Sequence, residues 1–134
     1  MIVDASIALA WCLADEADEL AERALELVAA EGAAAAVHWP LEVANGLLTA
    51  ERRGRLTASD ASRAGKLLHD LDIEIVPVEL STATGSVLDI ARRHGLSAYD
   101  AAYLGLAWFR AGPLATLDRP LREASIAEGV ALFD

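Results

Sequence analysis

Short apolar runs alternate with longer segments of helical periodicity along the whole chain, and this alternation limits the folds that it can adopt. The pattern is typical of helices packed on a mostly parallel sheet. We therefore expect an α/β fold with strands at the short runs and helices between them. The expected strands are 2–4, 34–38, 73–76, 114–116 and an edge strand at 130–133. The expected helices are 6–13, 16–31, 39–53, 57–71, 81–94, 97–111 and 119–128.

Local signals support several of these boundaries. Pro40 is placed for the first turn of a helix, where its missing N–H costs nothing. Thr57 and Asp60 have the spacing of a capping box, and Gly95 is placed to end a helix. The strand at 34–38 contains weak strand formers, so its prediction depends on the alternation with helices more than on propensity.

Length and composition predict one globular domain over residues 1–134. Apolar residues make up 54% of the chain, which is too high for a disordered tail. The single cysteine, Cys12, cannot form an internal disulfide, and there is neither a signal-peptide pattern nor an apolar run approaching 18 residues. We expect a cytoplasmic protein without a membrane span.

The formal net charge of −10 argues against binding nucleic acid through a broad basic surface, because such binding neutralises many phosphates. It leaves room for an enzyme that meets phosphates through bound cations and a few arginines. It also favours a basic protein partner through long-range attraction.

Four acidic residues fall where the loops at one edge of the expected sheet would gather. Asp4 ends the first expected strand and Asp118 follows the fourth, whereas Glu42 and Asp100 lie in the first turns of helices. Ligands of open parallel sheets bind beyond the carboxyl ends of the strands. Gathered carboxylates repel one another unless a cation or a proton lies between them, and donors that are all oxygen favour Mg²⁺ or Mn²⁺.

Each acid also has a structural interpretation, and these alternatives remain open from the sequence. Asp100 follows Ser97 at capping-box spacing, Glu42 could complement a helix start, and Asp118 could be an N-cap. Asp4 is the hardest to explain structurally, because the next helix is expected to begin only at Ser6.

Four segments resemble, in order and spacing, the motifs of PIN-domain proteins, and especially of the VapC toxins of prokaryotic toxin–antitoxin pairs. The likeness extends from residue 2 to the end of the chain. The segments are Ile2-Val-Asp-Ala-Ser6, Pro40-Leu-Glu-Val-Ala-Asn-Gly-Leu47, Ser97-Ala-Tyr-Asp-Ala-Ala-Tyr-Leu-Gly-Leu-Ala107 and Ala115-Thr-Leu-Asp-Arg-Pro-Leu121.

The resemblance implies a three-layer α/β/α sandwich with a five-stranded parallel sheet, and a homodimer inhibited by a cognate antitoxin. It also implies endonuclease activity on single-stranded RNA that depends on Mg²⁺ or Mn²⁺. Residue by residue, it assigns the four family acids to this chain, together with two polar positions that line the pocket and one supporting amide. The acids are Asp4, Glu42, Asp100 and Asp118, the polar positions are Ser6 and Thr116, and the amide is Asn45.

In the implied mechanism, Asp4 and Asp100 hold a metal ion, and Glu42 and Asp118 could hold a second. The metal would lower the pKa of a bound water and place it in line with the phosphodiester. The alternatives are a catalytically silent PIN-like binding module and a Mg²⁺-dependent phosphohydrolase of another class. The second fits less well, because no acid lies two positions after Asp4 and no lysine ends a late strand.

Overall fold

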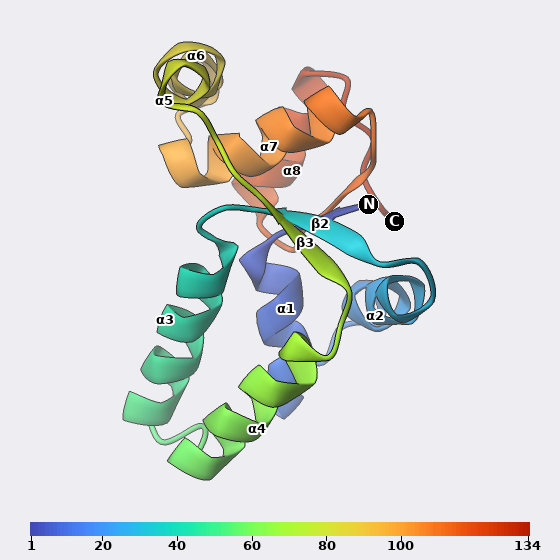
Figure 1. Ribbon diagram of the computed structural model, residues 1–134, viewed down its shortest axis with the longest axis vertical. Coiled ribbons are helices and arrows are strands. Elements are labelled where there is room, and N and C mark those ends of the chain that lie inside the picture. The colour runs from blue at the N-terminus through green and yellow to red at the C-terminus, as the bar shows by residue number, and fades with distance from the viewer.

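The computed structural model describes all residues, 1–134. One parallel sheet lies at its centre, in the order β3-β2-β1-β4. Helices lie on both sides of this sheet, which confirms the α/β prediction (Figure 1). The strands are β1 (Ile2–Val3), β2 (Ala33–Ala36), β3 (Ile73–Val76) and β4 (Leu114–Ala115).

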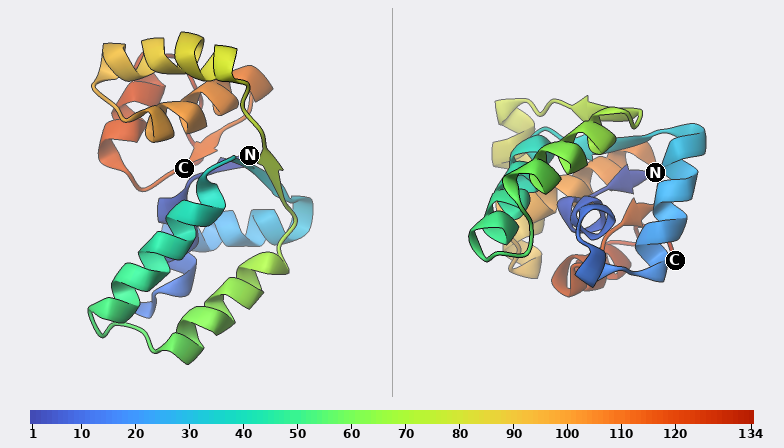
Figure 2. Two further views of the ribbon diagram at one scale, coloured as in Figure 1. Left: turned by 60° about the vertical axis from the view of Figure 1, so that its left-hand side comes forward. Right: turned by 90° about the horizontal axis from the view of Figure 1, so that it is seen from below.

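The helices divide into two groups, one on each side of the sheet, and Figure 2 shows the two groups from two further directions. The helix α7 contacts β1, β2 and β4 directly, and α1 contacts α2, α3 and α4. The first group is α1 (Ala5–Cys12), the 3₁₀ turn η1 (Ala14–Glu16), α2 (Glu19–Glu31), α3 (Trp39–Arg52) and α4 (Ala58–His69). The second is α5 (Leu80–Thr82), the π-helical stretch η2 (Ala83–Val87), α6 (Leu88–His94), α7 (Ala98–Arg110) and α8 (Arg119–Ala127).

The core lies where these helices pack on the two central strands. Val3, Leu104 and Leu114 are fully buried, and burial of this kind contributes roughly 1.5–3 kcal/mol for each such side chain. The strand β2 consists of four alanines and still forms, because it pairs with β1 on one side and β3 on the other. Its pairing therefore compensates for the weak strand propensity of alanine. No helix in the chain combines the length and the apolar character needed to span a bilayer.

The prediction of a fifth strand is wrong. Residues 130–133 form a single bridge, in which Leu132 pairs with Leu114, and the sheet has four strands. The strand β4 is only two residues long, so only the backbone N–H and C=O of Leu114 are available for pairing on its outer edge. Leu114 donates to Ala131 and accepts from Phe133 at 2.9 and 3.0 Å, and the ladder ends there.

Three other boundaries differ from the prediction because a side chain caps a helix or a backbone turns. The expected helix 16–31 begins at Glu19, since the carboxylate of Asp18 accepts from two backbone N–H groups at 2.8 and 3.3 Å. His38 lies in the αR region as the N-cap of α3 and not in the expected second strand. Asp4 lies outside β1 and caps α1, which begins at Ala5.

Candidate active site

The site begins where β1 and β4 end side by side. Val3 is paired in register with Ala115, so the next residues, Asp4 and Thr116, leave the sheet together. Their backbones stay in contact, because the N–H of Asp4 donates to the carbonyl of Ala115 at 3.2 Å. The helices α1, α3 and α7 begin at this same side of the sheet (Figure 1). This convergence agrees with the rule that parallel sheets bind ligands at their carboxyl edge.

Asp4 is buried, and both its carboxylate oxygens accept hydrogen bonds. Oδ1 accepts from the Ser6 hydroxyl at 2.6 Å and from the Ile7 N–H at 3.2 Å. Oδ2 accepts from the Thr116 hydroxyl. Asp4 is therefore the N-cap of α1, and the expectation that it had no helix to cap is wrong. The helix begins one residue earlier than expected because this cap is available.

Burial raises the pKa of the Asp4 carboxyl from 3.8 to about 6. Desolvation is the largest cause, and the three hydrogen bonds to the carboxylate oppose it by favouring the charged form. The nearby charge of Asp118 raises this pKa further, so the two acids interact. A cation beside Asp4 would reverse both unfavourable effects.

The hydroxyls of Ser6 and Thr116 each donate one hydrogen bond and accept another, and these bonds connect the segments that follow β1 and β4. While donating to Asp4, the Ser6 Oγ accepts the N–H of Leu117 at 2.8 Å, and the Thr116 Oγ1 accepts the N–H of Asp118 at 3.0 Å. Asp118 thus has a fixed backbone position.

The carboxylate of Asp118 is also an N-cap, because its Oδ1 accepts the N–H of Leu121 at 2.8 Å at the start of α8. The capping interpretation is therefore confirmed for this residue, and its other oxygen, Oδ2, has no hydrogen bond within the chain. A cap of this kind leaves one oxygen to bind a ligand.

Glu42 lies in the first turn of α3 and accepts a hydrogen bond from the hydroxyl of Tyr103 on α7. The pKa of Tyr103 is raised, first by burial and then by Glu42, with further contributions from the charges of Asp4 and Asp100. Three of the four predicted acids therefore act electrostatically on one buried hydroxyl.

Asp100 lies in the first turn of α7, where Ser97 accepts its backbone N–H at 3.1 Å. The Asp100 carboxylate accepts no hydrogen bond from the backbone N–H of Ser97, whereas Thr57 and Asp60 form the complete reciprocal box. The capping-box interpretation is thus confirmed at Thr57 and wrong at Asp100. Asn45 lies one turn after Glu42 and is exposed, without a hydrogen bond to the acids.

No three of these side chains have the mutual spacing of a finished metal cage. The donors are all oxygen, and the charges of three of the four acids act on one hydroxyl. The chemistry of this donor set fits a hard cation such as Mg²⁺ or Mn²⁺.

A model of the PIN domain matches residues 1–127. Over 127 residues the chain is 35% identical to Ribonuclease VapC3 of Pyrobaculum aerophilum, and the match covers 92% of each protein. This chain belongs to the PIN-domain family. VapC-type ribonucleases are therefore among the relatives of this PIN domain.

Two solved structures resemble this PIN domain. PAE2754 from Pyrobaculum aerophilum has a TM-score of 0.71 at 25% identity, with 98% of this chain and 86% of the other covered. A toxin–antitoxin complex from Klebsiella pneumoniae has a TM-score of 0.59 at 17% identity, with 87% and 85% covered. At that identity, the second likeness shows the fold alone.

Two residues of this PIN domain that contact Glu42 were not among the predicted site residues, Tyr103 and His38. His38 Nε2 lies 3.6 Å from Glu42 Oε2, and its ring is in edge contact with Tyr99 and Tyr103. A usable signal was present, because Tyr103 follows Asp100 by three residues and so lies on the same face of its helix.

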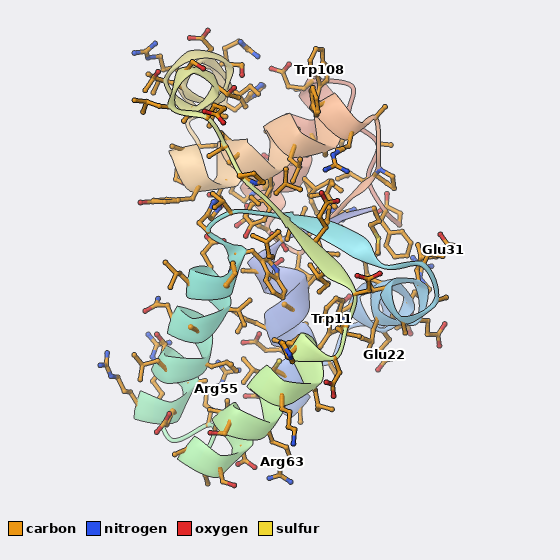
Figure 3. The ribbon with its side chains drawn as sticks, in the orientation of Figure 1. Trp11, Glu22, Glu31, Arg55, Arg63 and Trp108 are labelled. Carbon is orange, nitrogen blue, oxygen red and sulfur yellow. The ribbon has the colours of Figure 1, made fainter.

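Two arginines whose positive charge could attract RNA, Arg55 and Arg93, are paired with acids. Arg55 bonds to Asp15 and Glu16 at 2.8–3.0 Å, and Arg93 bonds to Glu128 at 2.8 Å. Figure 3 labels Arg55 beside α3 and α4, on the other side of the sheet from α7. Attraction of RNA by Arg55 is therefore weakened by its own partners.

Proposed function

We propose that this PIN domain, treated as one domain over residues 1–134, is an endoribonuclease that cleaves single-stranded RNA with Mg²⁺ or Mn²⁺ as cofactor. The main support is the buried Asp4, whose pKa is raised by burial and by Asp118, in a chain 35% identical to a protein named as a ribonuclease. A carboxylate in this environment is stable in its charged form when a cation shares the site.

The four acids would hold the metal: Asp4 and Asp100 one ion, with Glu42 and Asp118 available for a second. When bound, such an ion supplies the Lewis acidity that lowers the pKa of water and stabilises charge on a phosphodiester. Ser6 and Thr116 fix the orientation of Asp4 through their hydrogen bonds. We assign Asn45, one turn from Glu42, to the rim of the site. This chemistry requires no side-chain nucleophile.

The histidines at two helix ends have other roles than acid–base catalysis. His94 contacts Glu128 at 2.6 Å, and His69 lies in the last turn of α4, where a positive charge complements the helix dipole. Neither belongs to the group of residues around Asp4. His69 and His94 are therefore not candidates for the chemistry.

The experiment is cleavage of unstructured and structured RNA by purified, antitoxin-free protein, with Mg²⁺, with Mn²⁺ and with excess EDTA. We expect cleavage of the unstructured RNA with either metal and none in EDTA. Asp89→Asn, which changes an exposed carboxylate, is the matched control and should cleave like the wild type. Equal cleavage in EDTA would refute the metal mechanism.

We further propose that the protein is the toxin of a toxin–antitoxin pair and acts in the cytoplasm, where RNA is available. The 35% identity to a protein named Ribonuclease VapC3 supports this role, and the net charge of −10 suits a basic inhibitor. Expression of the chain alone should stop bacterial growth, and co-expression of its genomic neighbour should restore it. Unimpeded growth with verified folded protein would favour the alternative of a silent binding module.

A homodimer is the third part of the proposal. Trp108 and Phe109 at the end of α7 are 68% and 78% exposed, and they line a groove together with Val78. Leu80, two residues after Val78, is also an exposed apolar side chain. Figure 3 shows Trp108 projecting from α7. We propose that a second copy of the chain covers this face. Light scattering should give twice the chain mass for the wild type and a lower mass for Trp108→Ser.

A further inference from the structure

A hydrogen bond between two helices controls one of the four acids. Glu42 on α3 and Tyr103 on α7 are 61 residues apart, and the Tyr103 hydroxyl donates to Glu42 Oε2. Tyr103 is only 1% exposed, whereas the Glu42 side chain is one-third exposed. The donor is therefore fixed in the core, whereas the acceptor side chain lies partly at the surface.

The same oxygen faces a second group. His38 Nε2 lies 3.6 Å from Glu42 Oε2, which is too long for a hydrogen bond, and this nitrogen is buried without a partner. The His38 ring lies edge-on to Tyr103 and Tyr99, with ring centroids 4.9 and 5.2 Å away. Glu42 Oε2 thus faces two protein groups, whereas Oε1 has no hydrogen-bond partner in the chain and is left for a ligand.

The Tyr103 hydroxyl remains a donor under ordinary conditions. A carboxylate can only accept, so the phenolic O–H is the donor of this bond, and Tyr103 is only 1% exposed. A permanent donor fixed in the core is suited to holding a carboxylate in one orientation.

We propose that Tyr103 is a positioning residue of the metal site, which holds Glu42 by Oε2 so that only Oε1 is presented to the cation. The proposal rests on the proposed function, in which Glu42 is a metal ligand. It deepens that function by adding a residue outside the four acids. The opposing interpretation is that Glu42 merely satisfies a buried hydroxyl.

The test compares Tyr103→Phe with Tyr99→Phe. Both changes remove the hydroxyl of a tyrosine whose ring contacts His38, but the structure shows a bond to Glu42 only for Tyr103. Mn²⁺ affinity, measured by the electron paramagnetic resonance signal of free Mn²⁺, should weaken roughly tenfold in Tyr103→Phe, as is typical when a group supporting a ligand is removed. It should stay at the wild-type value in Tyr99→Phe, and cleavage by Tyr103→Phe should recover as Mn²⁺ is raised.

A double-mutant cycle separates positioning from a general structural role. If Tyr103 acts through Glu42, Tyr103→Phe should weaken Mn²⁺ binding in the wild type and add little in a Glu42→Gln background. Additive losses would overturn the proposal, as would a folded Tyr103→Phe that binds Mn²⁺ like the wild type while Asp100→Asn does not. If the wild type itself takes up no Mn²⁺, the proposed function fails and the positioning role fails with it.

A measurement on the unsubstituted side chain covers the case in which Tyr103→Phe does not fold. The chain has two tyrosines, so ¹³Cζ-labelled tyrosine gives two signals that Tyr99→Phe assigns. Titration with Mg²⁺ should shift the Tyr103 signal, because its hydrogen-bond acceptor Glu42 becomes a metal ligand. The Mg²⁺ concentration at the midpoint of this shift should equal the midpoint of Mg²⁺ binding by the whole protein. A Tyr103 signal that does not respond at saturating Mg²⁺ would overturn the proposal.

Discussion

Replacement of Asp4 by Asn should separate a metal ligand from a structural acid. The pKa of Asp4 is raised from 3.8 to about 6, a difference of about 2 units. At 1.36 kcal/mol per unit, burial of the charged form costs about 3 kcal/mol at pH 8. Asn removes this cost and can still accept from Ser6 and Ile7. It loses the bond that Thr116 donates to Oδ2, worth about 1–2 kcal/mol.

The net expectation for Asp4→Asn without metal at pH 8 is a gain of about 1–2 kcal/mol in the free energy of unfolding. An unfolding entropy of about 2.1 cal/mol/K per residue converts 1 kcal/mol into about 4 °C for a chain of this length. The melting temperature should therefore rise by about 4–8 °C. Cleavage of RNA should nevertheless fall by orders of magnitude, because the charge that holds the cation is gone.

The pH dependence of this gain has a definite sign. The pKa of Asp4 is higher in the folded protein than the ordinary value of 3.8, so its burial costs nothing below about pH 4 and its full amount above about pH 7. The wild type should lose stability between these pH values through this residue, and Asp4→Asn should not. The advantage of the variant should therefore be largest at pH 8 and absent or reversed at pH 4.

The assay consists of thermal melts at pH 4 and pH 8 in EDTA, then in excess Mn²⁺, beside RNA cleavage. Asp89→Asn, an exposed acid paired with Arg92, is the control and should match the wild type throughout. Only the wild type and the control should gain stability from Mn²⁺. A variant at Asp4 that melts lower than the wild type in EDTA at pH 8, yet cleaves at the wild-type rate, would show that Asp4 has a structural role only.

Substitutions at Asp118 and Gly46 test the cap at α8 and the packing of α1 on α3. Asp118→Asn should keep the N-cap and change the free energy of unfolding by less than about 0.5 kcal/mol, but it should abolish the rise in melting temperature with Mn²⁺. Asp118→Ala should abolish this rise and also lose about 1 kcal/mol of stability, because the cap is gone. Equal Mn²⁺ responses in the wild type and Asp118→Asn would show that this residue is not part of the metal site. Gly46→Ala should cost about 1–3 kcal/mol in denaturant unfolding, because its Cβ would lie 2.4 Å from Leu9 Cδ1. Gly65→Ala, with open space around its Cβ, should gain up to about 1 kcal/mol, and a similar gain at position 46 would contradict the close packing.

Local signals in the sequence were enough to locate the helices and most of the strands. The capping box at Thr57 and the helix end at Gly95, with φ at 63°, were predicted correctly because each depends on neighbours in sequence. The errors at helix starts fell where an aspartate side chain caps the helix. Asp4 and Asp18 cap helices that the periodic pattern alone placed one residue too late and three residues too early, respectively.

The sequence by itself determined the alternation of strands and helices and supplied the four candidate acids, because periodicity, caps and motif order are all recorded in neighbouring residues. Only the tertiary structure decided what those acids contact. The bond from Thr116 to Asp4 joins residues 112 apart, and the bond from Tyr103 to Glu42 joins residues 61 apart. Such contacts depend on strand register and on helix packing, and so does the burial that raises the pKa of Asp4. The loss of the fifth strand has the same origin, since it follows from how little of the β4 edge is available for pairing.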